Sequence, residues 1–573
     1  MQKPLRGVSF IDVIVGTALI LIIFLALFGV LRVTLQVSAL AKAEAAATSL
    51  AQSKVEFIRS LDYDAVGTLG GIPPGTIAQT ATSTLDGIAF TTRTYIQYED
   101  DAKDGVGLAD SNGITTDYKR VKISVSYSVG GKDKEVSLVT NVVPPGLETT
   151  TGGGTLRINV IDAGGLPVSG ASVRIVNAST APTVDVTTFS SDIGVVYLPG
   201  AATSSEYQVY VSKSGYSSAQ TYTRDATNQN PNPGYLTVAK DQTTTGTFSI
   251  DVLSAVTMRT YSPIQTATTT DTFASSASLT NMAQSAVTGG ALTLSGASGT
   301  YPSSGSARQV VVSPSYLYSW KSVTATRQTT ASTTAKIRVL DSSGTRLPDA
   351  VLSGNSAGFT AFPVSLSGVS TTTYSSLMLE ADLGSVDAMY TPQVLDWSLS
   401  YETGPTPLPN IPFTLTGAKT KGTTGAGAPI IKNTIATTTD STGVRALSLE
   451  WDIYTLTISG YDVTDSCSPP PYTIAPGITD TYSLYMVPSG VVGQVLVSVK
   501  DATGAVVSGA TVQLTKSGYS STVTTNTCGT GHFGNLSSGT YTITISKTGY
   551  TTAVYTGVSV TTGTTTFYAT SFE

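Results

Sequence analysis

The first 61 residues combine an unbroken apolar run with an amphipathic one. Residues 13–31 contain no charged side chain, and a helix of this length spans about 28 Å, the thickness of the hydrocarbon core of a bilayer. Over residues 40–61 apolar side chains recur at helical spacing, and most charged side chains lie away from the stripe that they form. No proline interrupts residues 5–72. The pattern predicts one long helix over residues 8–61, the first half membrane-spanning and the second amphipathic.

Beyond this helix the pattern changes to alternation with a period of two, which is typical of strands with one buried face. Two such segments, 118–129 and 134–143, are separated by a Gly-Gly turn that indicates a hairpin. We therefore expect a small antiparallel β head over residues 62–145. Residues 146–155 are rich in threonine and glycine, and we expect them to form a linker.

The rest of the chain repeats itself. DAGGLPVSGASVRI at 162–175 aligns with DATGAVVSGATVQL at 501–514, and the late strands at 207–219 and 541–553 align as well. A more divergent copy lies within 403–488. We expect three units of one plan, at residues 156–255, 403–488 and 489–573. Residues 256–402 match none of these three units, and we expect them to form a different β-sandwich.

Composition supports a β-rich protein outside the cytoplasm. Only 12% of the residues are charged and the net charge is −6, which argues against nucleic-acid binding. The chain has one histidine and two cysteines, too few for the usual zinc sites. No phosphate loop, GxSxG elbow or HExxH motif occurs. We therefore expect no enzymatic activity and no cofactor, with calcium as the one exception considered.

Three groups of residues could still carry chemistry or binding. His532 lies beside a turn and is expected to be a surface or half-buried strand residue. Glu380 and Asp382 share one face of a strand, as the carboxylates of a glycosidase could, although strands commonly carry such pairs on their solvated side. Trp397 is expected in a sandwich core rather than on a sugar-stacking surface.

A Gly-rich acidic segment follows the second head strand. Its carboxylates suit calcium, which prefers six to eight oxygen ligands, although their spacing matches no EF-hand loop. A solvated acidic turn is the alternative. The candidate calcium ligands are Asp100, Asp101, Asp104 and Asp110.

The two cysteines, Cys467 and Cys528, fall in adjacent repeat units on the side of the membrane where disulfides persist. One cysteine in each unit suggests a disulfide that joins the two units. Two buried thiols in separate cores are the alternative.

The order of parts at the N-terminus differs from that of an ordinary signal peptide, because the glycine precedes the apolar run. The segment MQKPLRG-VSFID resembles the class III leader of type IV pilins and type II secretion pseudopilins. The resemblance implies cleavage after Gly7 by a prepilin peptidase and methylation of the new N-terminus at Val8. It also gives Asp12 the role of the acid that assists assembly, although the family usually has Glu there and Phe or Met in place of Val8.

An acid in this position has a physical rationale of its own. A carboxylate inside a membrane helix is costly and normally has a partner. After cleavage, the nearest cation is the new α-amino group, on the same or a neighbouring chain. The alternative is that Asp12 sits hydrated at the bilayer interface.

The repeat units resemble carboxypeptidase regulatory-like domains, which are small seven-stranded β-sandwiches of transthyretin type. The segment ending PQVLDWSLSYE is similar to the closing strand of jelly-roll modules. Collagen-adhesin B-type domains also look similar. Their pattern begins with a strand in which Lys precedes Asp, and Lys500 and Asp501 fit this start. Their isopeptide bond needs a glutamate that the late strand here lacks, so we predict no such bond in the last unit.

The expected function is that of a non-enzymatic pilin-like subunit, minor or at the tip, that displays adhesion modules. It would reside in the cytoplasmic membrane as a single-pass protein before assembly, and in an extracellular pilus or on the cell surface afterwards. The expected partners are the prepilin peptidase, other pilin or pseudopilin subunits, and a surface glycan or protein ligand. The alternatives are a membrane-anchored binding protein that does not polymerise and a secreted hydrolase with a pseudopilin-like anchor.

Overall fold

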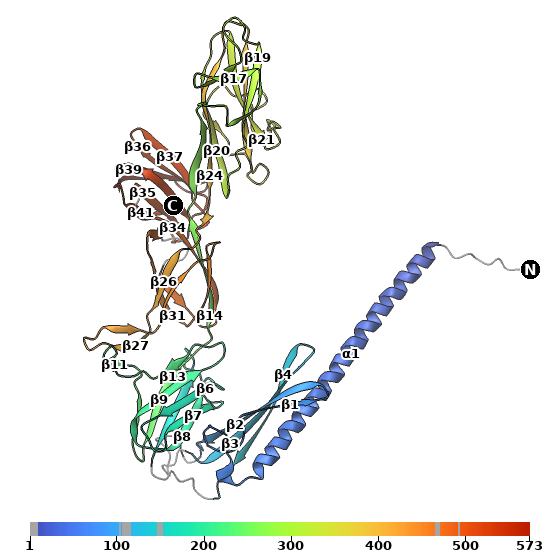
Figure 1. The fold of residues 1–573 in the computed structure, drawn as a ribbon, viewed down its shortest axis with the longest axis vertical. Coiled ribbons are helices and arrows are strands. Elements are labelled where there is room, and N and C mark those ends of the chain that lie inside the picture. Colours follow the sequence, from blue (N-terminus) through green and yellow to red (C-terminus); the bar gives the residue numbers. More distant parts are fainter. Residues whose placement is uncertain are drawn as a thin grey trace, which may run out of the picture.

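The computed structural model describes residues 10–101, 103, 105, 116–145, 153–463, 470–490 and 493–572 of the chain. Figure 1 shows an elongated arrangement, with a long helix and a small sheet at one end and a series of β-sandwiches leading away from them. The expected fold class is confirmed: one long N-terminal α-helix is followed by mainly-β tandem sandwiches.

The helix and the head form the first part of the described chain. Their elements are α1 (Phe10–Arg59), the short 3-10 helix η1 (Tyr63–Ala65), β1 (Thr80–Leu85), β2 (Ile88–Glu99), β3 (Tyr118–Val129) and β4 (Lys132–Val142). The four strands form an antiparallel sheet in sequence order. Gly130 and Gly131 make the expected hairpin turn between β3 and β4, with φ values of +61° and +76° that glycine adopts readily.

The second half of α1 packs on this sheet. Ala43, Ala47 and Ala51 follow one another at helical spacing and are at most 1% exposed. Their small side chains allow the helix backbone to approach the sheet, where the alternate residues Val121 and Ile123 of β3 are fully buried. The amphipathic half of the helix is therefore part of the core of the head.

The first sandwich follows residue 153. Its strands are β5 (Gly154–Ile161), β6 (Ser172–Asn177), β7 (Val184–Phe189), β8 (Val195–Ala201), β9 (Ser204–Ser212), β10 (Ala219–Gln220), β11 (Asn230–Pro231), β12 (Leu236–Val238) and β13 (Thr243–Ser249). One sheet has the order β13-β5-β8, with β13 parallel to β5, and the other has the order β10-β9-β6-β7. The apolar faces of the two sheets enclose one core.

The last sandwich repeats this topology. Its strands are β35 (Gly493–Asp501), β36 (Thr511–Lys516), β37 (Tyr519–Thr524), β38 (Thr530–Leu536), β39 (Gly539–Ser546), β40 (Ala553–Val560) and β41 (Thr565–Phe572). The sheets are β41-β35-β38 and β40-β39-β36-β37. The aligned aspartates make the same turn: Asp162 Oδ1 and Asp501 Oδ1 each accept the amide N–H groups two and four residues further on.

A third sandwich of the same plan is interrupted by an insertion. Its strands are β14 (Ser254–Ser262), β25 (Thr406–Pro407), β26 (Pro412–Gly417), β27 (Thr420–Thr423), β28 (Pro429–Ile431), β29 (Thr434–Thr438), β30 (Val444–Leu449), β31 (Asp452–Ile458), β32 (Tyr461–Val463), β33 (Tyr472–Ile474) and β34 (Thr479–Pro488). Strand β14 runs parallel to β34 and antiparallel to β30, as β5 does to β13 and β8. Residues 256–262, which the sequence pattern groups with the segment 256–402, thus pair instead with strands of residues 403–488.

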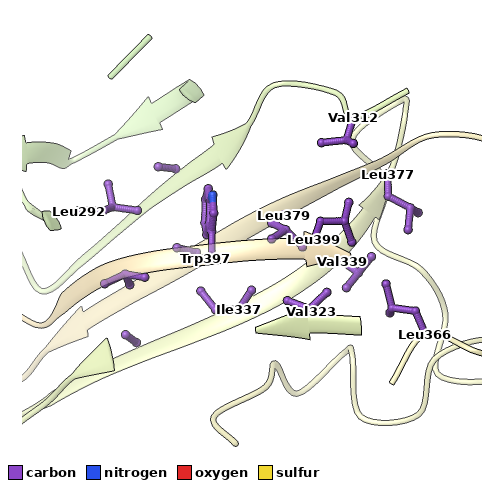
Figure 2. Packing of buried hydrophobic residues seen from close by; sticks show 14 of the residues in the cluster. Leu292, Val312, Val323, Ile337, Val339, Leu366, Leu377, Leu379, Trp397 and Leu399 are labelled. Carbon is purple, nitrogen blue, oxygen red and sulfur yellow. The ribbon is translucent and has the colours of Figure 1, made fainter. Parts of the chain in front are cut away.

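The inserted sandwich lies between β14 and β25 of the third one. Its strands are β15 (Gln265–Asp271), β16 (Leu279–Ala283), β17 (Ser285–Thr288), β18 (Ala291–Leu294), β19 (Ser304–Gln309), β20 (Leu317–Gln328), β21 (Thr333–Asp341), β22 (Val364–Ser365), β23 (Leu377–Ser385) and β24 (Gln393–Thr403). Trp397 of β24 is fully buried between the two sheets, among Leu379, Ile337 and Leu399 (Figure 2). The expected core position of this tryptophan is confirmed.

Neighbouring parts of the chain are joined by direct contacts. Ile72, in the loop before the head sheet, is 2% exposed and belongs to the core of the first sandwich. The first and third sandwiches share a small sheet in which β11 pairs with β27. The last sandwich contacts the inserted one through a hydrogen bond from the Thr524 amide to Glu402. The parts of the described chain are thus docked on one another rather than only tethered.

Candidate functional site

The first half of α1 is a long apolar surface that no other described part of the chain covers. The large apolar side chains between Phe10 and Val37 whose exposure is described are 50–78% exposed. The segment Thr17–Arg59 contains an 18-residue window of mean hydropathy 2.7 that has no buried residue. By length and composition this helix can cross a membrane, and a signal sequence near the N-terminus passes the same test.

The helix leaves the head as a rigid extension of a packed element. Arg59 at its end donates to Thr140 Oγ1 of β4 from Nε and Nη2, at 3.2 and 2.9 Å. Lys119 Nζ of β3 donates to the carbonyl of Tyr63 at 2.8 Å, just past the helix end. These bonds, with the alanine face of the helix, fix the direction in which the apolar half projects (Figure 1).

The residues of the leader motif are only partly within the described chain. Gly7 and Val8 lie outside the described residues. Asp12 lies in the first turn of α1, in the run that the sequence assigns to the membrane. Cleavage after Gly7, methylation of Val8 and the pairing of the Asp12 carboxylate therefore stay predictions.

The candidate calcium ligands are also divided. Asp100 and Asp101 follow β2, whereas Asp104 and Asp110 lie outside the described residues. Asp101 Oδ1 accepts the Lys103 amide at 3.1 Å, and the Asp101 amide donates to Asp117 Oδ2 at 2.6 Å. Within the described ranges, no group of three or more His, Cys, Asp or Glu side chains could hold a metal ion. Calcium binding by the four aspartates together remains a prediction.

Cys528 is 5% exposed and lies in the turn before β38. It takes part in a disulfide and therefore does not titrate. Cys467 lies outside the described residues, so the pairing of the two cysteines stays a prediction.

His532 is more buried than its neighbourhood in the sequence suggests. It is only 8% exposed, and its Nε2 lies 3.1 Å from Gln494 Oε1. Burial lowers the pKa of His532 to about 4, so the ring is neutral near pH 7. The expected surface or half-buried position is wrong. His532 lies outside the core of the last sandwich, but strand β15 of the inserted sandwich contacts β38, and Gln265 and Thr266 of β15 line the same pocket as His532.

Glu380 and Asp382 are held by arginines. Burial raises the pKa of Glu380, but hydrogen bonds from Arg346 and Arg308 outweigh it, so the pKa lies below its ordinary value. Asp382 pairs with Arg338 and Arg346. A general acid in a glycosidase needs a raised pKa. This carboxylate pair is therefore suited to stabilising the sheet through ion pairs rather than to proton transfer.

The sequence gives no signal for a cluster at the junction of the first and third sandwiches. Lys419 and Lys432 both donate to Glu450 at 2.8 Å, and the Trp451 ring lies beside Lys419. The two lysines lie at opposite ends of the β27–β28 segment, and the other side of the junction comes from residues 219–249. No spacing in the sequence relates these positions, so only the folded chain brings them together.

Comparisons with known proteins identify one domain. Residues 494–570 match the carboxypeptidase regulatory-like domain family, which agrees with the seven strands of the last sandwich. A search of curated proteins finds no match to the sequence.

Several solved structures are similar to this chain at a distance. The TIE protein of Bacillus anthracis is 12% identical, with a TM-score of 0.16, over 86% of this chain and 73% of that one. BcpA, the major pilin subunit of Bacillus cereus, is 9% identical with a TM-score of 0.14, over 74% of this chain and 99% of its own. The shaft pilin of Lactobacillus rhamnosus GG is 14% identical with a TM-score of 0.12, over 30% and 90%. At TM-scores this low, the likeness carries no functional argument.

Proposed function

We propose that this chain is a pilin-like structural subunit of the type IV pilin and type II pseudopilin class. A prepilin peptidase would cut it after Gly7 and methylate Val8, and the helix α1 would pack with helices of other subunits. One observation carries the proposal. A single 50-residue helix has an exposed apolar half and an amphipathic half that packs on a four-stranded antiparallel sheet. An ordinary signal sequence is removed from the mature protein, whereas this helix contributes part of the core of the head.

The size of the rest of the chain favours a minor or tip position. The four sandwiches occupy most of a 59.0 kDa chain and extend well beyond the head (Figure 1). A filament that repeated this bulk at every subunit would be crowded. The work of the chain in this proposal is packing and display, and the sandwiches serve as adhesion modules outside the cell.

Mass spectrometry of the native N-terminus tests the proposal. The expected result is a chain that begins with N-methylated Val8 and whose further peptides all match the sequence after Val8. A Gly7→Ala variant, which removes the glycine at the cleavage site but keeps the apolar run, should retain residues 1–7. An unprocessed N-terminus in the native envelope would instead support the membrane-anchored binding protein that does not polymerise. A cut on the far side of the apolar run would contradict both.

A further inference from the structure

A pocket of about 300 Å³ lies at the junction of the first and third sandwiches. Tyr210, Tyr222 and Tyr235 line it from the first sandwich, and Lys421 of β27 and Ile430 of β28 line it from the third. Pockets for small molecules usually measure about 300–1,000 Å³, so this tyrosine pocket suits a single ring-sized group. Its aromatic side chains offer such a group an apolar surface with polar hydroxyls at the edge.

Hydrogen bonds across the junction hold the two walls of the tyrosine pocket together. Strand β11 of the first sandwich pairs with β27 of the third. The Asn232 amide and the Asn228 side chain both donate to the carbonyl of Lys421, at 3.1 and 3.0 Å, and Asn228 is only 6% exposed. The backbone of Lys421 is therefore fixed by the other sandwich. A pocket that is formed before its ligand arrives has a lower entropy cost of binding.

Asp225 presents one oriented carboxylate oxygen to the pocket. Its Oδ1 accepts hydrogen bonds from the Asn228 amide at 2.7 Å, from Thr227 Oγ1 at 2.7 Å and from the Thr227 amide at 2.8 Å. These bonds from Asn228 and Thr227 hold the pKa of Asp225 below its ordinary value, so the group is a carboxylate at neutral pH. Its Oδ2 accepts no hydrogen bond from the residues that the structure describes. This oxygen is therefore available to a ligand.

Three further polar groups of the pocket have no hydrogen-bond partner within the described part of the chain. They are Lys421 Nζ, which forms no ion pair there either, and the hydroxyls of Tyr222 and Tyr235. An ammonium group only donates, a carboxylate only accepts, and a phenol does both. The tyrosine pocket thus offers both donors and acceptors to one occupant.

The charges of the pocket balance. Among the described residues that line it, Asp225 and Lys421 are the only charged ones. The adjacent cluster around Glu450 has two lysines and two carboxylates. Neither an acidic nor a basic ligand gains a net attraction from these groups, so the pocket favours a neutral occupant.

Two of the three tyrosine rings are open to an apolar contact. The Arg174 guanidinium lies 6.0 Å from the centre of the Tyr210 ring. Tyr222 and Tyr235 are half-buried, and within the described ranges no other aromatic ring or cation lies over either ring. An occupant that uses these rings and the free polar groups has an apolar face and a polar rim.

A pyranose has this form, because its C–H groups make an apolar face and its hydroxyls both donate and accept. We propose that the tyrosine pocket binds a neutral pyranose of an extracellular glycan, with sugar hydroxyls bonded to Asp225 Oδ2 and Lys421 Nζ. The C–H face lies against the rings of Tyr222 and Tyr235. This inference rests on the proposed function, in which the sandwiches are adhesion modules outside the cell. Its test uses the purified chain, so failure to bind a sugar and failure to be processed or to assemble are separate results.

The test is binding of the methyl glycosides of glucose, galactose and mannose to the full chain, in micelles of a detergent whose head group is not a sugar. Calorimetry measures the affinity, and saturation-transfer NMR identifies the sugar protons in contact. The expected result is saturable binding of at least one glycoside, with the strongest transfer to the C–H protons of one ring face. Because the ligand is neutral, its affinity should change less than about twofold between low and high salt.

Three outcomes of this measurement would overturn the inference. The first is no saturable binding of any of the three glycosides up to about 20 mM, which is above the weak millimolar range expected for one small group. The second is a loss of affinity of about tenfold or more at high salt, which would indicate an ionic ligand. The third is tighter binding of a zwitterionic peptide such as diglycine, which would assign the pocket to peptides.

Asp225→Asn localises the binding. Asparagine keeps Oδ1 and with it the three hydrogen bonds of the turn, but it replaces Oδ2 by a group that cannot accept. The affinity should fall at least about tenfold. Asp241→Asn is the matched control, because the Asp241 side chain is 72% exposed in the same sandwich and outside the pocket; it should leave the affinity unchanged. Equal affinity of Asp225→Asn and the native chain would overturn the inference. The comparison among ligands needs no variant, so it decides even if Asp225→Asn does not fold.

Discussion

Glu402 and Thr524 are hydrogen bonded across two sandwiches, from the Thr524 amide to Glu402 Oε1 at 3.0 Å. Glu402 is the last residue but one of strand β24 of the inserted sandwich and is fully buried. It also accepts from Lys321 Nζ at 3.2 Å and from Ser319 Oγ at 2.6 Å. The Glu402 carboxylate thus accepts hydrogen bonds from an ammonium group and a hydroxyl of the inserted sandwich and from a backbone amide of the last sandwich.

This relationship predicts the effect of Glu402→Gln. The variant keeps the shape of the side chain but removes the charge that faces Lys321. Its amide N–H₂ group takes the place of one carboxylate oxygen, and it cannot accept the hydrogen bond from the Thr524 amide or from the Ser319 hydroxyl that this oxygen accepted. We expect a loss of about 2–4 kcal/mol in the free energy of unfolding. Calorimetry should show the transition of the inserted and last sandwiches at lower temperature. Glu206→Gln, at an exposed position of the first sandwich, is the control, and an equal shift in both variants would contradict the prediction.

Local patterns in the sequence predict those parts of the fold whose contacts are local. The helix, the Gly-Gly hairpin and the turn made by Asp162 and again by Asp501 follow from helical periodicity and from short-range hydrogen bonds. The likeness of the first and last units rests on the same side chains in the same strands, so alignment of the two segments finds it.

Pairings between distant segments could not be predicted in this way. Strand β14 belongs with β34 although the whole inserted sandwich separates them along the chain. The edge between β11 and β27 and the cluster of Lys419, Glu450 and Trp451 likewise depend on how complete sandwiches dock. The burial of His532 is a similar case, because it depends on the contact of the inserted sandwich with β38 and not on the neighbours of His532 in the sequence.

The role of Asp12 predicts a separation of processing from assembly. An unpaired carboxylate costs about 2.5–3.5 kcal/mol at the centre of a membrane helix, and less near the interface. If Asp12 pairs with the amino group of Val8 on a neighbouring subunit, Asp12→Ala should be cut normally but assemble poorly, and Asp12→Glu should assemble at least as well as the native chain. Filament yield by electron microscopy and N-terminal mass measure the two steps.

A matched control for Asp12 lies on the same helix. Glu44→Ala removes an acid from an exposed position outside the apolar run, and it should affect neither processing nor assembly. Equal filament yields from the native chain and Asp12→Ala would rule out the pairing, as would a loss of yield in Glu44→Ala of the same size.

His532 predicts how stability depends on pH. Burial lowers its pKa from 6.5 to about 4 in the folded chain. Above pH 6.5 the ring is neutral in both the folded and the unfolded chain. Between pH 6.5 and about 4 only the unfolded chain takes up the proton, so the free energy of unfolding should fall, by roughly 3 kcal/mol in total. Below pH 4 this group causes no further loss.

Denaturant unfolding across this pH range measures the effect of His532. The chain has no other histidine, so His532→Gln should flatten the dependence between pH 6.5 and 5, where carboxylates contribute little. The variant keeps a polar group within reach of Gln494, which limits the loss of stability at neutral pH. An unchanged slope in His532→Gln would assign the pH dependence to other groups.

The disulfide of Cys528 predicts a covalent link between the third and last sandwiches. Cys528 is buried and disulfide-bonded, and Cys467 is the other cysteine of the chain. We expect non-reducing peptide mapping to find one linked pair of peptides that contain Cys467 and Cys528. Closing a loop of about 60 residues stabilises by roughly 4 kcal/mol on the chain-entropy model, so reduction should lower the unfolding temperature of the last sandwich. The Cys467→Ala/Cys528→Ala double variant should be insensitive to reductant. Two freely alkylated thiols in protein from the envelope would contradict the link.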